Sequence, residues 1–407
     1  MHKVIIIGGG PAGLMAAISA SKLNKKVILI EKNEKLGKKL YITGKGRCNL
    51  TNDVDAFEFL ENVVSNKKFL YSAINFLPPE KTMSFFEESG LQLKTERGKR
   101  VFPLSNKASD VTKTLENTCK KLGVEILLNT KVERIYTENG EVKGVVLTDK
   151  STILGDSVII ATGGISYPLT GSTGDGYKFA KKLGHNITEL KPALVGIELE
   201  GEFFKKLQGL SLKNVSLNCE SNNKNVFSEV GEMLFTHFGV SGPLVLTLSS
   251  LINRVNKENL DIYLDLKPGL DYNTLENKFI REFAQNSLKT IANYLRSVLP
   301  SSLINEVLIR ACIKQDRKLC DIKVEQRNNL INVLKRFEIK FNKLRSIEEA
   351  IVTSGGVNVK EINPKTMESK LIKGLYFAGE VIDVDAFTGG FNIQIAFSTG
   401  FLAGYNA

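Results

Sequence analysis

The feature that most constrains the fold is a glycine-rich turn between two apolar runs near the N-terminus. Residues 4–7 are continuously apolar, as in a strand buried on both faces of a parallel sheet. The glycines that follow are spaced G-x-G-x-x-G, and residues 14–23 have the apolar periodicity of a helix. A second apolar run, residues 27–30, ends at Glu31. This order predicts the strand–turn–helix–strand unit of a Rossmann-like α/β domain.

The 407-residue chain is too long for one core, so we predict further units. From about residue 190, short alternating segments separated by Gly, Asn and Pro indicate a small antiparallel barrel or sandwich. Residues 272–340 have helical periodicity, and the apolar run 375–378 precedes a C-terminal helix. We predict a nucleotide-binding domain at 1–190 and 352–407, an inserted β-barrel at 191–268 plus about 345–368, and a helical subdomain at 269–344.

Composition restricts the class of partner. The formal net charge is +11, which invites a nucleic-acid interpretation. The lysines are nevertheless spread along the chain as doublets, and there is no arginine-rich arm or aromatic–basic alternation. The sequence therefore argues against a nucleic-acid partner and favours a small-molecule substrate. It specifies no oligomeric state.

The cysteines and the hydropathy pattern indicate the compartment. Five cysteines show neither metal-ligand spacing nor an even disulfide framework, so we expect a reducing cytoplasm and no metal site. No uninterrupted apolar stretch is long enough to cross a bilayer, so no membrane association is predicted.

The glycines of the turn each have a physical role in binding a dinucleotide. Gly8 lets the chain turn out of the strand, Gly10 leaves room for a pyrophosphate, and Gly13 lets the helix pack closely. The phosphates would face N–H groups at the positive end of a helix. Glu31 stands about 18 residues after Gly13, where a carboxylate accepts ribose hydroxyls.

Two later segments favour FAD over NAD. Residues 159–164 form a buried strand ending in small residues, and residues 374–383 form a strand that leads to an acid. In flavoproteins of the two-dinucleotide type such an acid meets the ribityl chain, so Glu380 is assigned that role, with Asp383 in reserve. A helix from Ile393 then points its N-terminal N–H groups toward the flavin N1–C2=O edge, where charge collects on reduction.

A third segment, residues 41–52, is rich in glycine and hydrogen-bond donors and is predicted to line the cofactor site. Within it Cys48 has no partner cysteine nearby, which favours a packed thiol over a redox thiol. The full set of predicted cofactor-binding residues is Gly8, Gly10, Pro11, Ala12, Gly13, Glu31, Lys32, Lys39, Thr43, Gly44, Gly46, Arg47, Cys48, Asn49, Val132, Ala161, Thr162, Gly163, Gly379, Glu380, Asp383, Gly389, Gly390, Phe391, Asn392 and Ile393.

Taken together, these motifs resemble a bacterial flavoprotein family, the BaiN/YhiN-like NAD(FAD)-utilising dehydrogenases. The resemblance covers essentially the full length and rests on residues 43–49, 167–168 with 173–176, 235–243 and 353–357. It implies a Rossmann-like FAD domain of the two-dinucleotide type with an inserted β-barrel and a helical subdomain. Aminoacetone oxidase and a 3-dehydro-bile acid Δ4,6-reductase are members with assigned activities. Phe391 stands where the family commonly has tyrosine.

Two further segments bear on the reaction. Residues 170–185 resemble a segment of fumarate reductase and ketosteroid dehydrogenase flavoproteins, which move hydride at a carbon–carbon bond beside a carbonyl. His237, in the unusual segment 235–243, is the candidate catalytic residue of the inserted domain.

The sequence therefore predicts an FAD-dependent oxidoreductase that transfers hydride between flavin N5 and a small or steroid-like substrate. With no second G-x-G-x-x-G unit, transiently bound NAD(P)H is the electron donor expected for reduction of a conjugated C=C bond. The alternatives are an amine oxidase that uses O2, a flavin-dependent tRNA-modifying protein, and a flavin-binding regulatory protein without turnover.

Overall fold

Two compact units make up the chain, one of residues Met1–Ala193 and Ile347–Ala407 and the other of residues Leu194–Ser346. They are seen in a computed structural model of the chain, which describes residues 1–255 and 260–407. The second unit is inserted between the two segments of the first.

The first unit is built on five parallel strands in the order β20-β10-β1-β2-β6. In the middle is β1 (Lys3–Ile7), which pairs with β2 (Lys26–Ile30) on one side and β10 (Ser157–Ile160) on the other. The edge strands are β6 (Glu125–Leu127) and β20 (Leu375–Phe377). Residues 4–7 are almost fully buried, so the first apolar run is a central strand as predicted.

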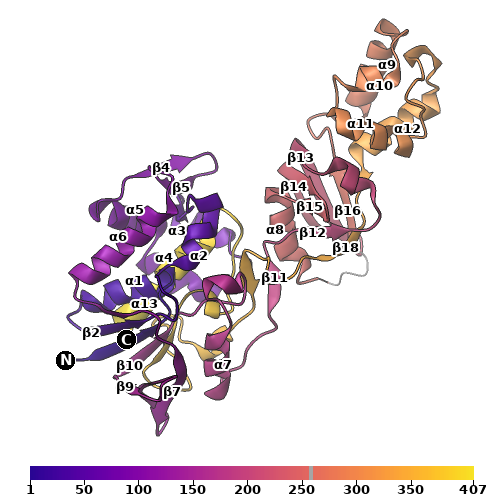
Figure 1. Ribbon diagram of the computed structural model, residues 1–407. Helices are drawn as coiled ribbons and strands as arrows, with labels where there is room; N and C mark the ends of the chain where they lie inside the picture. Colours follow the sequence, from indigo (N-terminus) through magenta and orange to yellow (C-terminus); the bar gives the residue numbers. More distant parts are fainter. Residues whose placement is uncertain (256–259) are drawn as a thin grey trace. The chain divides into compact units, whose positions relative to one another are not determined.

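Helices cover one face of this sheet and a small antiparallel sheet covers the other (Figure 1). On the helical face, α1 (Pro11–Ser21) packs against the C-terminal helix α13 (Phe391–Asn406). The opposite sheet has the strands β7 (Val132–Glu138), β8 (Glu141–Leu147) and β9 (Thr152–Leu154). Asn139 and Gly140, a favoured turn pair, connect β7 and β8.

Further helices and strands surround this core and supply the loops used below. The helices are α2 (Lys38–Ile42), α3 (Ala56–Glu61), α4 (Tyr71–Phe76), α5 (Pro79–Glu88), α6 (Ala108–Lys121) and α7 (Asp175–Lys182), with a 3-10 turn η1 (Thr43–Gly46). The remaining strands are β3 (Thr51–Asn52), β4 (Leu93–Glu96), β5 (Arg100–Pro103), β11 (Lys191–Ala193) and β19 (Val352–Ser354).

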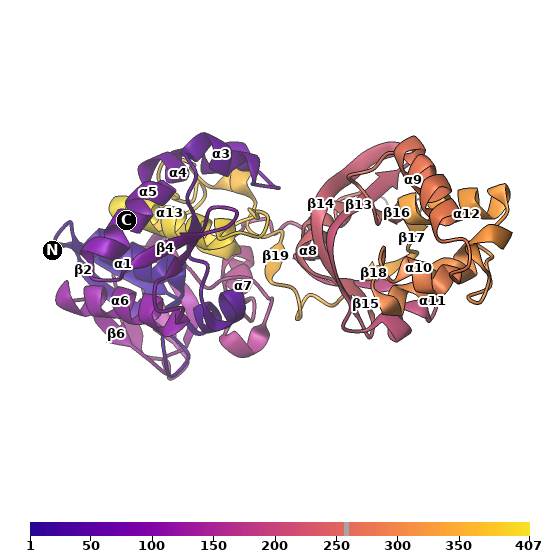
Figure 2. The same ribbon diagram turned by 90° about the horizontal axis from the view of Figure 1, so that it is seen from above.

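The second unit contains a seven-stranded antiparallel sheet in the order β17-β16-β13-β14-β15-β12-β18. Its strands are β12 (Ile197–Leu199), β13 (Ser211–Ser221), β14 (Lys224–Thr236), β15 (Gly239–Ser241), β16 (Leu260–Asp265), β17 (Phe337–Glu338) and β18 (Phe341–Leu344). The helix α8 (Pro243–Ile252) packs on β14. Four more helices lie together beside β16 and β17 (Figure 2): α9 (Tyr272–Gln285), α10 (Ile291–Leu295), α11 (Ser301–Arg310) and α12 (Val324–Lys335).

One segment differs from the boundaries drawn from the sequence. Residues 347–351, assigned there to the barrel alone, and residues 352–368, assigned there to both domains, belong to the first unit. The reason is that β19 pairs with β11, and the Thr353 amide donates to the Glu380 carboxylate at 2.9 Å. Alternating apolar residues in a strand do not reveal which sheet the strand joins.

The predicted fold class is confirmed: a Rossmann-like α/β unit carries an inserted antiparallel β unit with a helical subdomain. Among the described residues, no helix combines the length and hydrophobicity that a bilayer span requires.

The contact between α1 and α13 gives a test of the core. A Cβ added at Gly400 would lie 2.2 Å from the Ala12 carbonyl oxygen, which is backbone and has no room to yield. Gly400→Ala should therefore destabilise the FAD-free chain by about 1–3 kcal/mol, measured by thermal unfolding. Gly10→Ala is the control, because a Cβ at Gly10 meets nothing within 4 Å. Equal unfolding midpoints for the two variants would contradict this packing.

Candidate functional site

The predicted cofactor residues come together at the carboxyl edge of the parallel sheet. Ile7, the last residue of β1, is in register with Ile30 of β2 and Ile160 of β10, and β20 ends beside β10. In open α/β sheets ligands bind at this edge, where neighbouring connections leave in opposite directions. The segments that follow the four strand ends are residues 8–13, Glu31, residues 161–163 and residues 379–380.

The glycine turn has the geometry that a pyrophosphate requires. Gly8 has φ +108°, and a Cβ there would lie 2.5 Å from the Ala161 oxygen. A Cβ at Gly13 would lie 1.9 Å from the Gly8 oxygen, so the helix touches the strand end. At Gly10, the N-cap of α1, a Cβ would meet no atom within 4 Å. The space in front of the helix N-terminus is therefore open, as phosphate binding by N–H groups needs.

Glu31 is positioned by its neighbours with one acceptor site to spare. It is 8% exposed, and its carboxylate accepts hydrogen bonds from the Gly9 amide at 2.7 Å and from the amide and side chain of Asn33. A carboxylate has about four lone-pair positions, so these three bonds leave one for a ribose hydroxyl. The predicted site residue Val132 lies near Glu31, because the amide of Thr130, two residues earlier in the chain, donates to the Glu31 carbonyl oxygen.

The Lys32 side chain binds other protein groups and is not left as a free cation at the carboxyl edge of the sheet. Its Nζ lies 2.7 Å from Asp175 Oδ2 and also bonds Thr173. Burial alone would raise the pKa of Asp175, but the hydrogen bond and charge of Lys32 outweigh it and lower that pKa. The pair ties the start of α7 to the end of β2, so Lys32 supports the site through segment 170–185.

Glu380 lies at the edge within a polar network that the sequence did not reveal. Its carboxylate accepts from Lys39 Nζ at 2.8 Å, from Ser166 Oγ at 3.1 Å and from the Thr353 amide at 2.9 Å. Lys39 also donates to Ser166. Ser166 and Thr353 are the residues that sequence reasoning missed. Both lie in or next to motifs noted above, but neither motif by itself indicated a contact with Glu380.

The donor-rich loop 41–52 reaches the N-terminus of α13, as expected for a shared site. Asn52 Nδ2 donates to the Gly389 oxygen at 3.0 Å, and Thr51 Oγ1 donates to Gln394 Oε1 at 2.7 Å. A Cβ at Gly390 would lie 2.4 Å from the Thr51 oxygen. The helix begins at Phe391, two residues before the predicted start, because Gly390 supplies a left-handed N-cap with φ +99°.

Two residues of that loop contact other protein groups: Arg47 has protein partners where a cofactor contact was predicted, and Cys48 is the packed thiol that the sequence favoured. The Arg47 guanidinium stacks 4.2 Å from the Phe102 ring and bonds Glu96 and Asn106, so it anchors the loop to the β4–β5 hairpin. Cys48 is fully buried with φ +58°. Burial raises the pKa of its thiol to about 12, so it is a packed thiol.

Two buried polar atoms give a direct test of whether a ligand fits this edge. Asn49 Oδ1 and Thr162 Oγ1 are buried and have no hydrogen-bond partner among the described residues. Buried polar atoms in proteins are almost always paired, so unpaired ones point to a missing partner. Both atoms belong to the predicted cofactor set. Together with the open space at Gly10, they fit a bound dinucleotide with polar groups.

The other predicted residues are distributed around the same edge. Gly379 packs on Ala12, with an added Cβ only 2.8 Å from the alanine Cβ. Asn392 exchanges hydrogen bonds with the backbone of Ala386, and Thr43 Oγ1 donates to the Leu40 oxygen. In the first unit there remain Pro11, Gly44, Gly46, Ala161, Gly163, Asp383, Gly389, Phe391 and Ile393, whose cofactor contacts stay predictions.

His237 belongs to the second unit, in the turn between β14 and β15. It is exposed, and its ring lies edge-to-face against Phe238 with centroids 5.1 Å apart. The Arg345 guanidinium in turn lies over the Phe238 ring, 4.7 Å from the ring centroid. A catalytic role for His237 stays a prediction.

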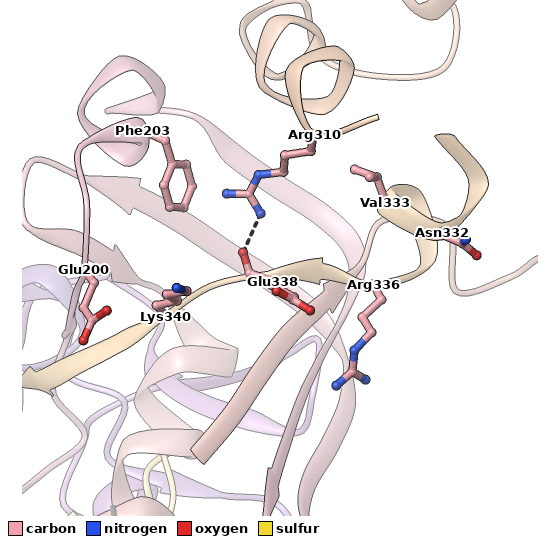
Figure 3. Close-up of a pocket in the computed structure, with 8 residues that line it drawn as sticks. All are labelled: Glu200, Phe203, Arg310, Asn332, Val333, Arg336, Glu338 and Lys340. Atoms are coloured by element: carbon pink, nitrogen blue, oxygen red, sulfur yellow. Dashed lines mark hydrogen bonds between the residues drawn. The ribbon is translucent and has the colours of Figure 1, made fainter. Parts of the chain in front are cut away.

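A separate pocket lies within the second unit, with a cavity volume of about 570 Å³ (Figure 3). Arg310 crosses it, stacking on Phe203 and donating to the Glu338 backbone oxygen at 2.6 Å. None of the predicted site residues lines it. The lining residues are Glu200, Phe203, Arg310, Asn332, Val333, Arg336, Glu338 and Lys340.

Comparison with known proteins assigns the chain to a family. The model of the family described as HI0933-like protein Rossmann domain matches residues 2–406. The chain belongs to this family. The predicted resemblance is thereby confirmed.

Similar proteins extend over almost the whole chain. A 3-dehydro-bile acid delta(4,6)-reductase of Clostridium scindens is 31% identical, covering 99% of this chain and 98% of its own. A ribosomal RNA dihydrouridine synthase of Haemophilus influenzae is 32% identical, covering 98% and 96%. A 3-ketosteroid-delta4-(5alpha)-dehydrogenase of Rhodococcus jostii has a similar fold, with a TM-score of 0.53, 14% identity, and coverage of 100% and 96%.

The family membership and the geometry of the edge agree. The chain is an FAD-dependent oxidoreductase whose substrate is unassigned, as predicted from the sequence at that level.

The open space at Gly10 predicts a variant that folds normally and binds the cofactor poorly. In Gly10→Ala the new methyl group would occupy the space in front of the α1 N-terminus, where the pyrophosphate is predicted. We expect FAD affinity to fall by at least about tenfold, which is 1.4 kcal/mol, in a fluorescence titration. Gly269→Ala, at another open position, should bind FAD normally. Unchanged affinity in Gly10→Ala would argue against this pyrophosphate position.

The cysteines predict a selective labelling pattern. Burial raises the pKa of Cys48, Cys119 and Cys219 to about 12, whereas Cys312 and Cys320 are exposed. A thiol is neutral below its pKa, so the three buried thiols lack nucleophilic thiolate at mildly alkaline pH. Iodoacetamide should modify only the two exposed cysteines of the folded chain and all five in denaturant, as read by peptide mass spectrometry. Alkylation of folded Cys48 as fast as Cys320 would restore the redox-thiol interpretation.

Proposed function

We propose that the chain is an FAD-dependent reductase of a carbon–carbon double bond conjugated with a carbonyl group. The observation that carries this proposal is the full-length similarity to two relatives whose names describe related reactions. The C. scindens name describes reduction of delta(4,6) double bonds in a 3-dehydro acid, and the H. influenzae name describes formation of dihydrouridine. In both reactions, the C=C bond that is reduced is conjugated with a carbonyl group.

The residues at the sheet edge would hold FAD, which when bound supplies the hydride for such a reduction. The α1 N-terminus and Gly10 would hold the pyrophosphate, and Glu31 the ribose. Asn49 and Thr162 would bond the polar groups of the cofactor with atoms that are otherwise unpaired. Lys39 neutralises Glu380 at 2.8 Å, so the Glu380 carboxylate adds little repulsion to the dianionic pyrophosphate.

The two relatives suggest two substrate classes. One is a small steroid-like enone, and the other is a uracil base in RNA. The net charge of +11 supports the second class, because RNA binding draws on cationic side chains. This proposal of an RNA substrate differs from the sequence analysis, which argued against a nucleic-acid partner. The amine-oxidase and tRNA-modification alternatives stay predictions.

The electron donor and the reaction type can be tested together. Mixing the FAD-loaded protein with NADH or NADPH without oxygen should bleach the flavin absorbance rapidly. Adding a conjugated steroid enone, or an RNA transcript containing uridine, should then restore the absorbance in step with loss of the double bond, measured by mass spectrometry.

The outcomes separate the candidates. Reoxidation by the enone or by the RNA identifies the substrate class, and a saturated ketone serves as the control that should not reoxidise the flavin. Bleaching by neither nicotinamide would refute an NAD(P)H-dependent reductase, and bleaching by a primary amine instead would favour the oxidase.

A further inference from the structure

We propose that the helical subdomain carries a docking surface for the ribose–phosphate backbone of RNA. The surface, here called the cationic strip, consists of Lys289, Lys314, Arg317, Lys318 and Lys323. This inference rests on the proposed function with RNA as the substrate class. It names the part of the chain that would hold such a substrate.

Backbone pairing brings the strip together from two segments. Thr290 and Lys318 form an isolated antiparallel bridge. The Ile291 amide donates to the Arg317 oxygen at 2.8 Å, and the Leu319 amide donates to the Lys289 oxygen at 3.0 Å. The turn before α10 and the segment between α11 and α12 therefore run side by side, and their cations lie close in space.

The charge of the protein is concentrated in this subdomain. Residues 269–344 contain fourteen Lys and Arg against eight Asp and Glu, so they contribute +6 of the formal +11. That is more than half of the net charge in less than a fifth of the chain. Such a concentration of charge on one module is the electrostatic footprint of a nucleic-acid-binding surface.

The strip lacks acidic partners among the described residues, as do Arg281, Arg296 and Lys340, whereas the other six cations of the subdomain each have one. Lys278, Arg310 and Arg327 each lie within 4 Å of a carboxylate. Within the part of the chain that the structure describes, none of the five strip residues has a carboxylate that close. The acids of the same segments are only Asp316 and Asp321, which leaves the strip with a net charge of +3.

Exposure makes these charges available to a partner. Lys289, Lys314, Lys318 and Lys323 are exposed, and Arg317 is half-buried. Leu288, next to Lys289, is 78% exposed, which offers an apolar contact to a ribose or base. Long unpaired lysines are suited to phosphate oxygens, which they contact as point charges without a fixed geometry.

The pocket in Figure 3 is the competing anion site in the same unit, and its charges are largely balanced. Arg336 pairs with Asp261 there, and Arg310 pairs with Glu306. Glu200 and Glu338 also line the pocket. A polyanion would meet carboxylates in that pocket, whereas the strip offers it unpaired cations.

RNA also fits the strip better than an anionic membrane does. Helices that lie on membranes present a broad apolar face with large aromatic or leucine side chains. The apolar side chains exposed beside the strip are Leu288 and Val324.

The test compares two triple variants that remove the same charge. The strip variant is Lys289→Gln, Lys314→Gln and Lys318→Gln. The control is Lys81→Gln, Lys113→Gln and Lys121→Gln, three exposed lysines of α5 and α6 that also lack an ion pair among the described residues. Both variants lower the net charge by three. Binding of a short labelled RNA hairpin to the FAD-loaded protein is measured by fluorescence anisotropy over a series of salt concentrations.

We expect the strip variant to bind the hairpin at least about tenfold more weakly than the wild type at low salt. The slope of log affinity against log salt should be shallower by about two to three, because three phosphate contacts are lost. The control should keep most of its affinity and slope. A third variant, with arginine at the three strip positions, should restore binding, since it restores the charge. Matching circular dichroism and unfolding midpoints exclude misfolding.

Several outcomes would overturn the docking surface. These are no hairpin binding by the wild type at low salt, equal losses in both triple variants, or binding by the strip to phosphatidylglycerol vesicles but not to RNA. The proposed reductase activity has its own readout in flavin bleaching by NAD(P)H. Reduction of an enone without RNA binding would therefore refute the strip alone, and RNA binding without bleaching would refute the reductase alone.

Discussion

The arrangement of the cofactor edge depends on how closely α1 lies against its neighbours. At its start, a Cβ on Gly13 would lie 1.9 Å from the Gly8 oxygen. Along its side, added Cβ atoms on Gly400 and Gly404 of α13 would lie 2.2 and 2.1 Å from backbone oxygens of α1. These contacts leave no space for a side chain. They fix the N-terminus of α1 at the end of β1 and place α13 directly beside α1, so that helix ends from both termini of the chain share one edge.

The charged residues of the edge stabilise one another before any ligand is present. Lys39 bonds Glu380, and Lys32 bonds Asp175. Each pair joins segments more than a hundred residues apart, so each acts as a cross-link between loops. The atoms left unpaired, Asn49 Oδ1 and Thr162 Oγ1, are neutral. The site therefore pairs Glu380 and Asp175 with lysines, and the groups it offers the cofactor are the Glu31 carboxylate, neutral polar atoms and helix ends. This suits a flavin, whose charge changes during the reaction.

Local signals were sufficient for the fold and for much of the site. The spacing of Gly8, Gly10 and Gly13 reports steric constraints within a few residues, and the structure has these constraints where the sequence indicated them. Partner choice was not readable in the same way. Arg47 stacks on Phe102 and bonds Glu96 rather than pointing freely along its loop, because a hairpin fifty residues later packs beside it. The contacts of Glu380 with Ser166 and Thr353 were missed for the same reason.

By itself the sequence determined a Rossmann-like unit with a dinucleotide edge, an inserted β unit and a helical subdomain, because apolar periodicity and glycine spacing are properties of neighbouring residues. The tertiary structure decided which strand residues 352–354 join, which carboxylates neutralise which lysines, and which cations remain unpaired. These depend on long-range packing. Lysines occur in every segment, and counting them in the sequence shows that residues 269–344 hold +6 of the net charge of +11 without showing which of these cations are paired. Only folding distinguishes the cations with acidic partners from those, such as Lys289 and Lys318, that lack them.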